Sequence, residues 1–537
     1  MKRNDFEKKK KGRLYRSFIE LIAVGSVTGF FAGVIVTFFT ILMHEGECIS
    51  RNIYAYVREN PIFLLLLFLA LSAGAFLLGV AVRISSVVKG CGIPQAEGGT
   101  RGIVRFRWYR DLTTMFAASL LSIFMGLSIG AEGPSVLIGA CAGDGVASTL
   151  KRDNMIRKFQ ITGGACTGLA VASNAPLTGM AFAFEEAHKR FTPEVFICAF
   201  SSVIFGMLTR SGIYSMLGME IENSFHSYVF YELPLRYYGY IVLAGIVCGL
   251  TGTLFYKLCF AMRKLFRRLG RKKERIADGL RIFVAVLIGG LVSLLAVGAM
   301  GGGHDLIESL GTYGGVSEPT VERTFGLSLT ITLLIVCVLK ILVTSINVGS
   351  GIPCGIFIPI IAIGACLGGL LNIVWLELGM EARYCDLMVM ICMAAFFTTI
   401  VKAPLTSIMM ICEFTGSFAP LLPVIIAVSL GYFIGEMFRT DGIYEELLSI
   451  YEKESCLHEH LVREVYVISV NPGAIADKRE VRDVLWPLGA RVTEITRGTE
   501  HIIPEGDTLL HSGDLITVVC KTSEPEMVRK ELEHILG

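Results

Sequence analysis

The sequence has little charge for its length. Only 18% of its 537 residues are Asp, Glu, Lys or Arg, and the formal net charge is +2. The basic residues stand in groups beside apolar segments, so no nucleic-acid surface is expected. The nine His and 15 Cys lack the spacing of a metal site, and the Cys lack that of a disulfide framework. A nucleophile, base and metal set at motif spacing is also missing, so neither an enzyme nor a cofactor is expected.

Long apolar stretches are abundant instead. Hydrophobic residues make up 53% of the chain, and apolar segments recur from Ser17 to about Met437, which predicts an integral membrane protein with several spans. The segment from Ser17 to Met43 is longer than the apolar core of a signal peptide, about 7 to 15 residues. It is therefore predicted to remain as the first helix, with residues 1–16 as a basic cytoplasmic N-terminus.

One membrane segment occurs twice. Gly130 to Gly143 aligns without a gap on Gly355 to Gly368, at a separation of 225 (355 − 130). Glu185 and Glu413 also correspond, and this hints at a structural role shared by both copies. Two flanking matches keep the same order: Gly25 to Gly29 with Gly245 to Gly249, and Ala175 to Thr178 with Ala403 to Thr406. The chain is thus predicted to contain a duplication, with copies at about residues 17–215 and 236–450.

The two copies are predicted to point in opposite directions. A basic run from Lys8 to Arg16 precedes the first helix of copy one, whereas a run from Arg263 to Arg275 follows its counterpart in copy two. Since Lys and Arg stay on the cytoplasmic side, equivalent helices run oppositely across the membrane. An inverted repeat with Gly/Pro-interrupted segments is typical of transporters, with the site where the copies meet near mid-membrane.

Three apolar pieces are predicted to be half-helices: Pro134 to Ser148, Pro176 to Ala187 and Pro359 to Ile373. At about 1.5 Å per residue they are too short for a hydrocarbon layer of roughly 30 Å. Helix N-termini buried at membrane depth supply unpaired amide donors and the positive end of the helix dipole. The expected occupant is an anion.

The end of the chain has a different character. After about residue 452 the sequence becomes rich in charge, and residues 462–537 are predicted to form a small soluble α/β module. It resembles the TrkA-C regulatory domain, which implies regulation or dimerisation with an unknown ligand. The expected strands are Glu464 to Val470, Arg491 to Thr496 and Asp514 to Val519, and the expected helices are Asp477 to Leu488 and Glu524 to Leu536.

Four motifs resemble those of the CLC chloride channel and exchanger family. They are Gly90-Cys-Gly-Ile-Pro94, Gly130-Ala-Glu-Gly-Pro134, Gly355-Ile-Phe-Ile-Pro359 and a late Tyr444, in the family's order. The resemblance covers about residues 14 to 450. It implies an all-α polytopic fold with broken helices, a homodimer in the cell membrane, and cytoplasmic placement of the N-terminus and the C-terminal domain.

The resemblance also implies the residues of an anion site. Helix N-termini and main-chain amides of the Gly/Pro motifs surround a central anion, and a Ser and the Tyr hydroxyl complete the site. Here Cys91 stands in the Ser position, and a thiol is a weaker donor than a hydroxyl, which leaves the anion preference open. The anion-binding residues carried over are Cys91, Gly92, Ile93, Gly133, Ile356, Phe357 and Tyr444.

Two glutamates are expected to carry protons. The resemblance makes Glu132, in a buried helix N-terminus, the gating glutamate that competes with chloride and takes up the proton; a Glu that only stabilises the helix is the alternative. Glu186 corresponds to the internal proton relay of the family's exchangers, which its channels lack. Solvated charge at a helix end is the alternative there, since Lys189 and Arg190 follow closely.

The expected function is exchange of chloride, or a similar anion, for protons across the bilayer. A passive chloride channel of the same fold is the first alternative, and Glu186 argues against it. A fluoride/proton exchanger is the second, because that branch also departs from Ser at the position of Cys91, but retention of Tyr444 argues against it.

Overall fold

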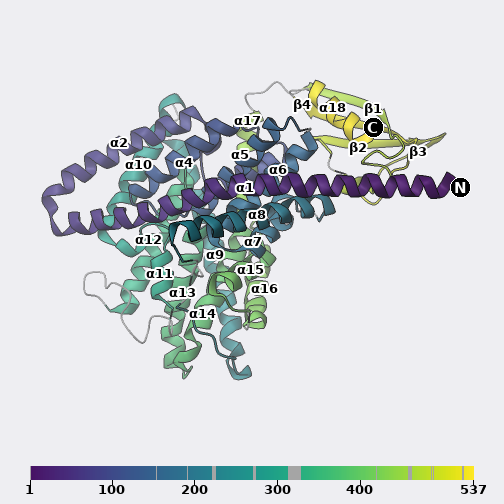
Figure 1. Cartoon of the computed structure of the whole chain (residues 1–537). Coiled ribbons are helices and arrows are strands. Elements are labelled where there is room, and N and C mark those ends of the chain that lie inside the picture. The colour runs from purple at the N-terminus through teal and green to yellow at the C-terminus, as the bar shows by residue number, and fades with distance from the viewer. Residues whose placement is uncertain are drawn as a thin grey trace.

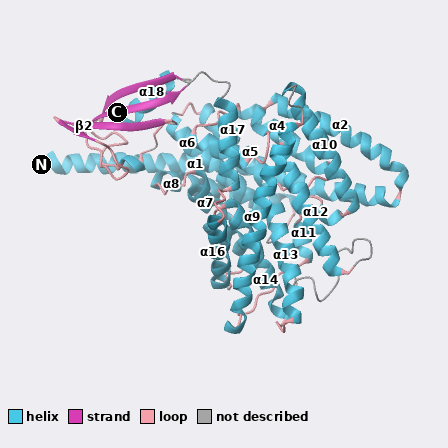
Figure 2. Cartoon of the chain, turned by 180° about the vertical axis from the view of Figure 1, so that it is seen from behind, coloured by secondary structure: helices cyan, strands magenta, loops and turns pink. Residues whose placement is uncertain are grey.

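Helices make up most of the chain, and within the described residues the strands lie near the C-terminus (Figure 2). The computed structural model describes residues 2–537 except 153, 190, 221–224, 226, 270–273, 312–327, 419, 457–461, 485, 488 and 523–524. Part of the second basic run and of the linker before the C-terminal module therefore lies outside the described residues. The helices of the membrane part are α1 Lys2–Glu59, α2 Leu64–Ile84, α3 Ile93–Arg101, α4 Trp108–Phe124, α5 Glu132–Thr149, α6 Asn154–Ser173, α7 Pro176–Phe182, α8 Pro193–Leu217, α9 Tyr238–Arg268, α10 Glu274–Leu295, α11 His304–Ser309, α12 Leu329–Ser350, α13 Phe357–Glu377, α14 Cys385–Val401, α15 Pro404–Thr415, α16 Leu421–Met437 and α17 Ile443–Cys456.

Eight helices of the described chain are long and apolar enough to cross a membrane. Many of their large apolar side chains face outward, such as Leu65, Phe76 and Leu254, as expected for a protein whose solvent is lipid. Helix α14 is buried along its whole length, and α13 over most of it. These two helices are therefore covered by other helices rather than by lipid, and they lie side by side in the lower part of Figure 1.

The two copies pack in the same way. In copy one α1 packs on α8, α5 on α6, and α6 on α8; in copy two α9 packs on α16, α13 on α14, and α14 on α16. The same glycines allow close contact in each copy. A Cβ on Gly139 would overlap the backbone of Gly164 in α6, and a Cβ on its equivalent Gly364 would lie 2.8 Å from the Cα of Met393 in α14. Small residues that let helix backbones approach are the usual packing device in membranes.

A reciprocal pair of glutamates joins the copies. Glu413 of α15 accepts hydrogen bonds from the amides of Leu177 and Thr178 at 2.7 and 2.8 Å, at the N-terminus of α7. Glu185, at the end of α7, accepts from the amides of Leu405 and Thr406 at 2.8 and 2.6 Å, at the N-terminus of α15. Each carboxylate satisfies amides that have no partner within their helix. Reciprocal contacts are the mark of a two-fold relation, so the shared structural role predicted for these two residues is confirmed.

Two expected helix boundaries differ in the structure. Helix α13 runs to Glu377 rather than ending near Ile373, and its 21 residues span about 31 Å at 1.5 Å per residue. The prediction that this segment is too short to cross a membrane was wrong, because apolar side chains continue one turn further. Helix α1 continues through residue 16 without a break, so the expected boundary there is one of composition alone.

The C-terminal module is a four-stranded antiparallel sheet with one helix. The prediction of a helix from Asp477 to Leu488 was wrong: the described part of this segment is turns and a single 3-10 turn, Val481–Asp483. Strand β3 was not foreseen because it has three residues. The elements are β1 Val462–Ser469, β2 Ala490–Arg497, β3 Glu500–Ile502, β4 Leu515–Thr522 and α18 Pro525–Leu536, with the strands in the order β1-β4-β2-β3.

The module rests against one end of the membrane part, near the N-terminus of α1 (Figure 1). Lys158 of α6 pairs with Glu531 of α18 at 3.6 Å, and Arg479 pairs with Glu194 at the start of α8. The module therefore contacts helices of copy one directly.

Candidate functional site

The three Gly/Pro motifs meet in the middle of the helical body. The amide of Gly130 donates to the carbonyl of Gly355 at 2.8 Å, so the equivalent glycines of the two copies pair with each other. The amide of Cys354 donates to the carbonyl of Gly90 at 3.1 Å, which ties in the first motif. A Cβ on Gly133 would overlap the carbonyl of Cys91. Glycine is thus required for the backbones of the three motifs to approach one another.

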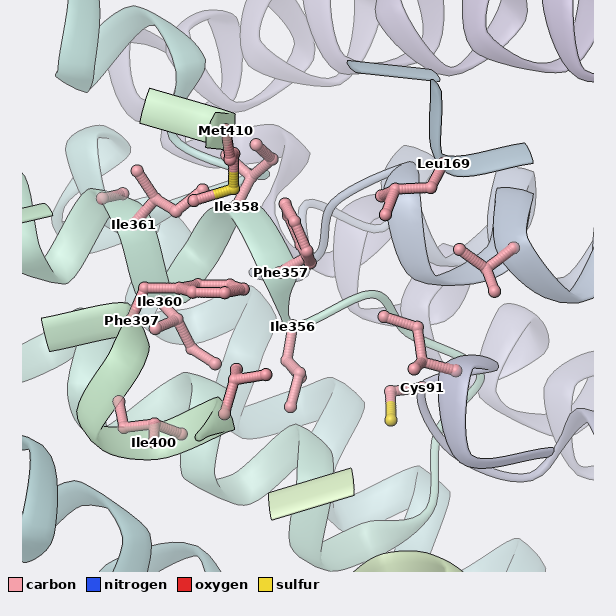
Figure 3. Packing of buried hydrophobic residues seen from close by; sticks show 14 of the residues in the cluster. Cys91, Leu169, Ile356, Phe357, Ile358, Ile360, Ile361, Phe397, Ile400 and Met410 are labelled. Carbon is pink, nitrogen blue, oxygen red and sulfur yellow. The ribbon is translucent and has the colours of Figure 1, made fainter. Parts of the chain in front are cut away.

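Two helices direct free amide groups into this region. In α5 and in α13 the third helical residue is Pro, and the first intrahelical bonds are made by Ser135 and Ile360. Gly133 and Phe357 come before these two residues in the chain, so their amides have no acceptor within their own helix. Figure 3 shows the turn of Ile356 and Phe357 with Cys91 on one side and Phe397 on the other. The arrangement offers donors and the positive ends of two helix dipoles to an anion.

Side-chain donors complete the region. Cys91 is 3% exposed and Tyr444 is 1% exposed. The Tyr444 hydroxyl has no hydrogen-bond partner among the described residues. A buried hydroxyl without a partner is unfavourable by about 1 to 3 kcal/mol, so an acceptor such as an anion would relieve it.

One carried-over donor is already engaged. The amide of Gly92 donates to Oε1 of Gln95 at 3.1 Å, and Nε2 of Gln95 donates to the carbonyl of Lys89 at 2.6 Å. This capping arrangement closes the N-terminus of α3, with Gly92 at a φ of +87°. Gly92 can therefore serve an anion only if Gln95 moves, whereas Ile93 is the first residue of the helix.

Glu132 is the first residue of α5 and is 1% exposed. Its Oε2 atom has no hydrogen-bond partner in the described part of the chain. The carboxylate folds back beside Gly130, where a Cβ would lie only 2.7 Å from Oε2. The carboxylate therefore lies beside the glycine of copy one that pairs with Gly355 of copy two.

Glu186 lies in a widened turn, Ala183–Ala187, that ends α7, and it is 4% exposed. Sequence reasoning missed its neighbour Glu97 of α3, which is 1% exposed and lies near Glu186 because α3 packs on the turn that carries Glu186. Arg101 lies 3.7 Å from Glu97 and donates to the Glu186 carbonyl at 3.1 Å. Burial distinguishes Glu186 from a solvated helix end. The only signal of Glu97 in the sequence was its position three residues after Pro94.

Comparison with known proteins identifies the family to which the chain belongs. The model of the voltage gated chloride channel family matches residues 73–436, and that of the TrkA-C domain matches residues 465–533. The first match covers more than half of the chain. The protein therefore belongs to the voltage gated chloride channel family, and it is a multi-pass membrane protein of the CLC fold with a TrkA-C domain.

Curated relatives cover most of the chain. It is 29% identical over 460 residues to the "H(+)/Cl(-) exchange transporter ClcA" of Vibrio cholerae serotype O1 (strain ATCC 39541 / Classical Ogawa 395 / O395), which covers 83% of this chain and 91% of the relative. It is 26% identical over 460 residues to the protein of the same name from Yersinia pseudotuberculosis serotype IB (strain PB1/+), over 82% of this chain and 91% of the relative.

Solved structures share the fold. A slow cyanobacterial Cl-/H+ antiporter superposes with a TM-score of 0.71 at 25% identity, over 81% of this chain and 99% of that one. A CLC-type fluoride/proton antiporter superposes with a TM-score of 0.61 at 20% identity, over 79% of this chain and 97% of that one. The second likeness concerns the fold alone.

Proposed function

We propose that the protein exchanges chloride, or a similar anion, for protons across the membrane. The observation that carries the proposal is the buried carboxylate of Glu132 at the N-terminus of α5, where the motifs of both copies meet. Relatives named as H(+)/Cl(-) exchange transporters support it.

The anion binds between the N-termini of α5 and α13. The amides of Gly133, Ile356, Phe357 and Ile93, the Cys91 thiol and the Tyr444 hydroxyl are its donors, and the Gly92 amide joins them when Gln95 releases it. The first support is the backbone contact among the three motifs, which directs these groups to one place. The second is the unpartnered Tyr444 hydroxyl.

Glu132 gates the anion path and carries the proton. While it is charged, its carboxylate competes with the anion for the same amides and dipole. Protonation at a carboxylate oxygen removes the charge, so the side chain leaves and the anion enters. A buried ionisable group within a membrane is expensive and is usually retained for such a purpose.

Glu186 relays the proton between Glu132 and the side of the molecule that bears the TrkA-C domain. Its burial, its position on copy one and the adjacent Glu97 support this role. A second ionisable group is needed to bind the proton on its way, because one carboxylate cannot contact water on both sides of an apolar interior.

The remaining features of the proposal concern assembly. Residues 17–452 form the transport domain and residues 462–537 regulate it or its dimerisation through an unknown ligand. The protein is a homodimer in the cell membrane, with the N-terminus and the TrkA-C domain in the cytoplasm. The contacts of Glu531 and Arg479 with α6 and α8 support a regulatory role.

The test is flux through the purified full-length protein in liposomes, followed with paired anion and pH electrodes. An outward chloride gradient should drive protons into the liposomes against the proton gradient. Chloride movement without proton movement would instead identify a passive channel. Coupled movement of fluoride with exclusion of chloride would identify a fluoride/proton exchanger.

A further inference from the structure

A histidine lies between Glu132 and water. His304 is the first residue of α11, and its Nε2 lies 3.7 Å from Oε1 of Glu132. The Glu132 side chain is 1% exposed, whereas that of His304 is 37% exposed. His304 belongs to none of the sequence motifs. It follows a run of glycines and lies 172 residues after Glu132 (304 − 132). The fold brings a partly exposed imidazole next to the buried carboxylate.

The structure holds the imidazole in place. The loop before it is fixed by Lys340 of α12, whose Nζ donates to the Gly301 carbonyl at 3.2 Å. Gly303 has a φ of +98°, and a Cβ there would lie 2.8 Å from the Cβ of Ala362 in α13, so the loop passes tightly between two helices. The imidazole also packs on the ring of Phe225, with centroids 5.9 Å apart.

His304 is on the side of the molecule away from the TrkA-C domain. Its neighbour Glu47 lies on α1, 27 residues after Glu20 (47 − 20), and Glu20 pairs with Arg152 at the opposite end. At 1.5 Å per residue these two sites are about 40 Å apart along α1.

Glu186 is on the side of the TrkA-C domain. Its carbonyl accepts from Arg101, and a Cβ on the next residue, Gly102, would lie 3.5 Å from Lys158, which pairs with Glu531 of that domain. His304 and Glu186 therefore lie on opposite sides of Glu132.

Charged groups of both signs surround the imidazole. They are Glu47 and Arg51 on α1, Glu132 on α5, Asp305 on α11 and Lys340 on α12. Arg51 pairs with Asp305 and lies 3.8 Å from Glu47. Burial lowers the pKa of His304, but the carboxylates of Glu132 and Glu47 more than offset it and Lys340 only partly opposes them, so the pKa lies above its usual value. The raised pKa favours the imidazolium, which is the form that can donate a proton.

We propose that His304 passes protons between external water and Glu132, which deepens the proposed proton-coupled exchange and rests on it. The proton leaves Nε2 of the imidazolium and bonds to Oε1 of the Glu132 carboxylate, which leaves a neutral imidazole and a neutral carboxyl. The imidazole then regains a proton from water. The distance of 3.7 Å exceeds that of a direct hydrogen bond, so transfer needs a small side-chain shift or one bridging water.

The test compares the parent protein with His304→Gln in liposomes, with proton uptake driven by a chloride gradient at external pH values from about 5 to 8. Glutamine retains hydrogen bonding but cannot titrate. We expect proton uptake to fall about 10-fold or more, as for loss of a general acid–base group, and the pH dependence in the histidine range to disappear. Added imidazole should restore uptake in His304→Ala. His44→Gln, an exposed histidine on α1, is the matched control and should behave as the parent.

A purely structural role predicts a different result. In a Glu132→Gln background there is no carboxylate to protonate, so adding His304→Gln should leave anion flux unchanged. A similar loss of anion flux in both backgrounds would overturn the relay and assign His304 to pore packing. An unchanged rate and pH profile in His304→Gln would overturn it as well. Absence of proton uptake in the parent would reject the proposed exchange together with the relay, whereas normal coupling in both proteins rejects the relay alone.

Discussion

The two copies agree at the glutamates that join them and differ at the two glutamates proposed to carry protons. Glu185 and Glu413 correspond, and each caps the other copy's half-helix. Glu132, in contrast, corresponds to Phe357 (357 − 132 = 225), and Glu186 corresponds to Phe414 (414 − 186 = 228). Phe357 packs on Phe397 with ring centroids 4.8 Å apart, and Phe414 packs on Phe225 at 5.4 Å. The carboxylates present in both copies hold the copies together, whereas the two glutamates proposed to carry protons occur in copy one and are replaced by Phe in copy two.

The largest effect should come from Glu132→Gln. Glutamine cannot take up the proton, so proton uptake driven by a chloride gradient should fall below detection while the remaining anion flux becomes independent of pH. Phe357→Leu, at the equivalent position of copy two, is the matched control and should keep coupling. Paired anion and pH electrodes on liposomes measure both. Equal loss of coupling in the two variants would break the comparison.

Glu186→Gln should separate the two ions. Anion movement should continue because Glu186 is not one of the proposed anion donors. Proton uptake should fall by at least about 10-fold, because the proposed inner proton relay is lost. Phe414→Leu is the matched control at the equivalent position. Normal proton coupling in the Glu186→Gln protein would remove this residue from the mechanism.

The sequence predicted the features that depend on local pattern. The order and spacing of the motifs predicted the duplication. The Gly/Pro motifs also predicted where the broken helices begin and that Glu132 lies at a helix N-terminus, because neighbouring residues determine where a helix starts. The sequence predicted the ends of the helices less accurately than their beginnings. No residue directly after Ile373 signals the end of helix α13, which continues to Glu377. The segment from Asp477 was predicted to be helical, but its described residues form turns.

Contacts between residues on different helices could not be predicted from the sequence. Glu97 and His304 belong to no motif with a proton role, and they meet Glu186 and Glu132 only through packing of α3 on the end of α7 and of α11 on α13. The same holds for Gln95, whose bond to the Gly92 amide occupies an expected anion donor. A single sequence shows which residues are ionisable, but their proximity comes from tertiary contacts.

Both reciprocal caps should contribute to stability, and Glu413 somewhat more, because it also accepts from the Thr178 hydroxyl at 2.6 Å. Glu185→Gln and Glu413→Gln each weaken two charge-assisted bonds to amides, so each should lower the free energy of unfolding by about 1 to 3 kcal/mol. Transport per folded molecule should remain coupled in both. Thermal unfolding in detergent, with flux on the folded fraction, measures the two quantities. A loss of coupling confined to Glu185→Gln would show that this cap also handles protons, and the structural half of the comparison would then fail.

Cys91→Ser should give the smallest effect, because it changes one donor among several. The hydroxyl makes a stronger hydrogen bond than the thiol, and a stronger donor favours the anion of higher charge density. Preference for chloride over larger, weakly hydrated anions should therefore rise, by about 2- to 10-fold if the new bond contributes about 0.5 to 1.5 kcal/mol. Cys141→Ser, a buried cysteine within α5, is the control and should leave the anion order unchanged. Competition between anions in liposomes measures the preference. An order unchanged by Cys91→Ser would mean that the amides of the two helix N-termini set selectivity, so that the anion site would depend on what the copies share rather than on this side chain of copy one.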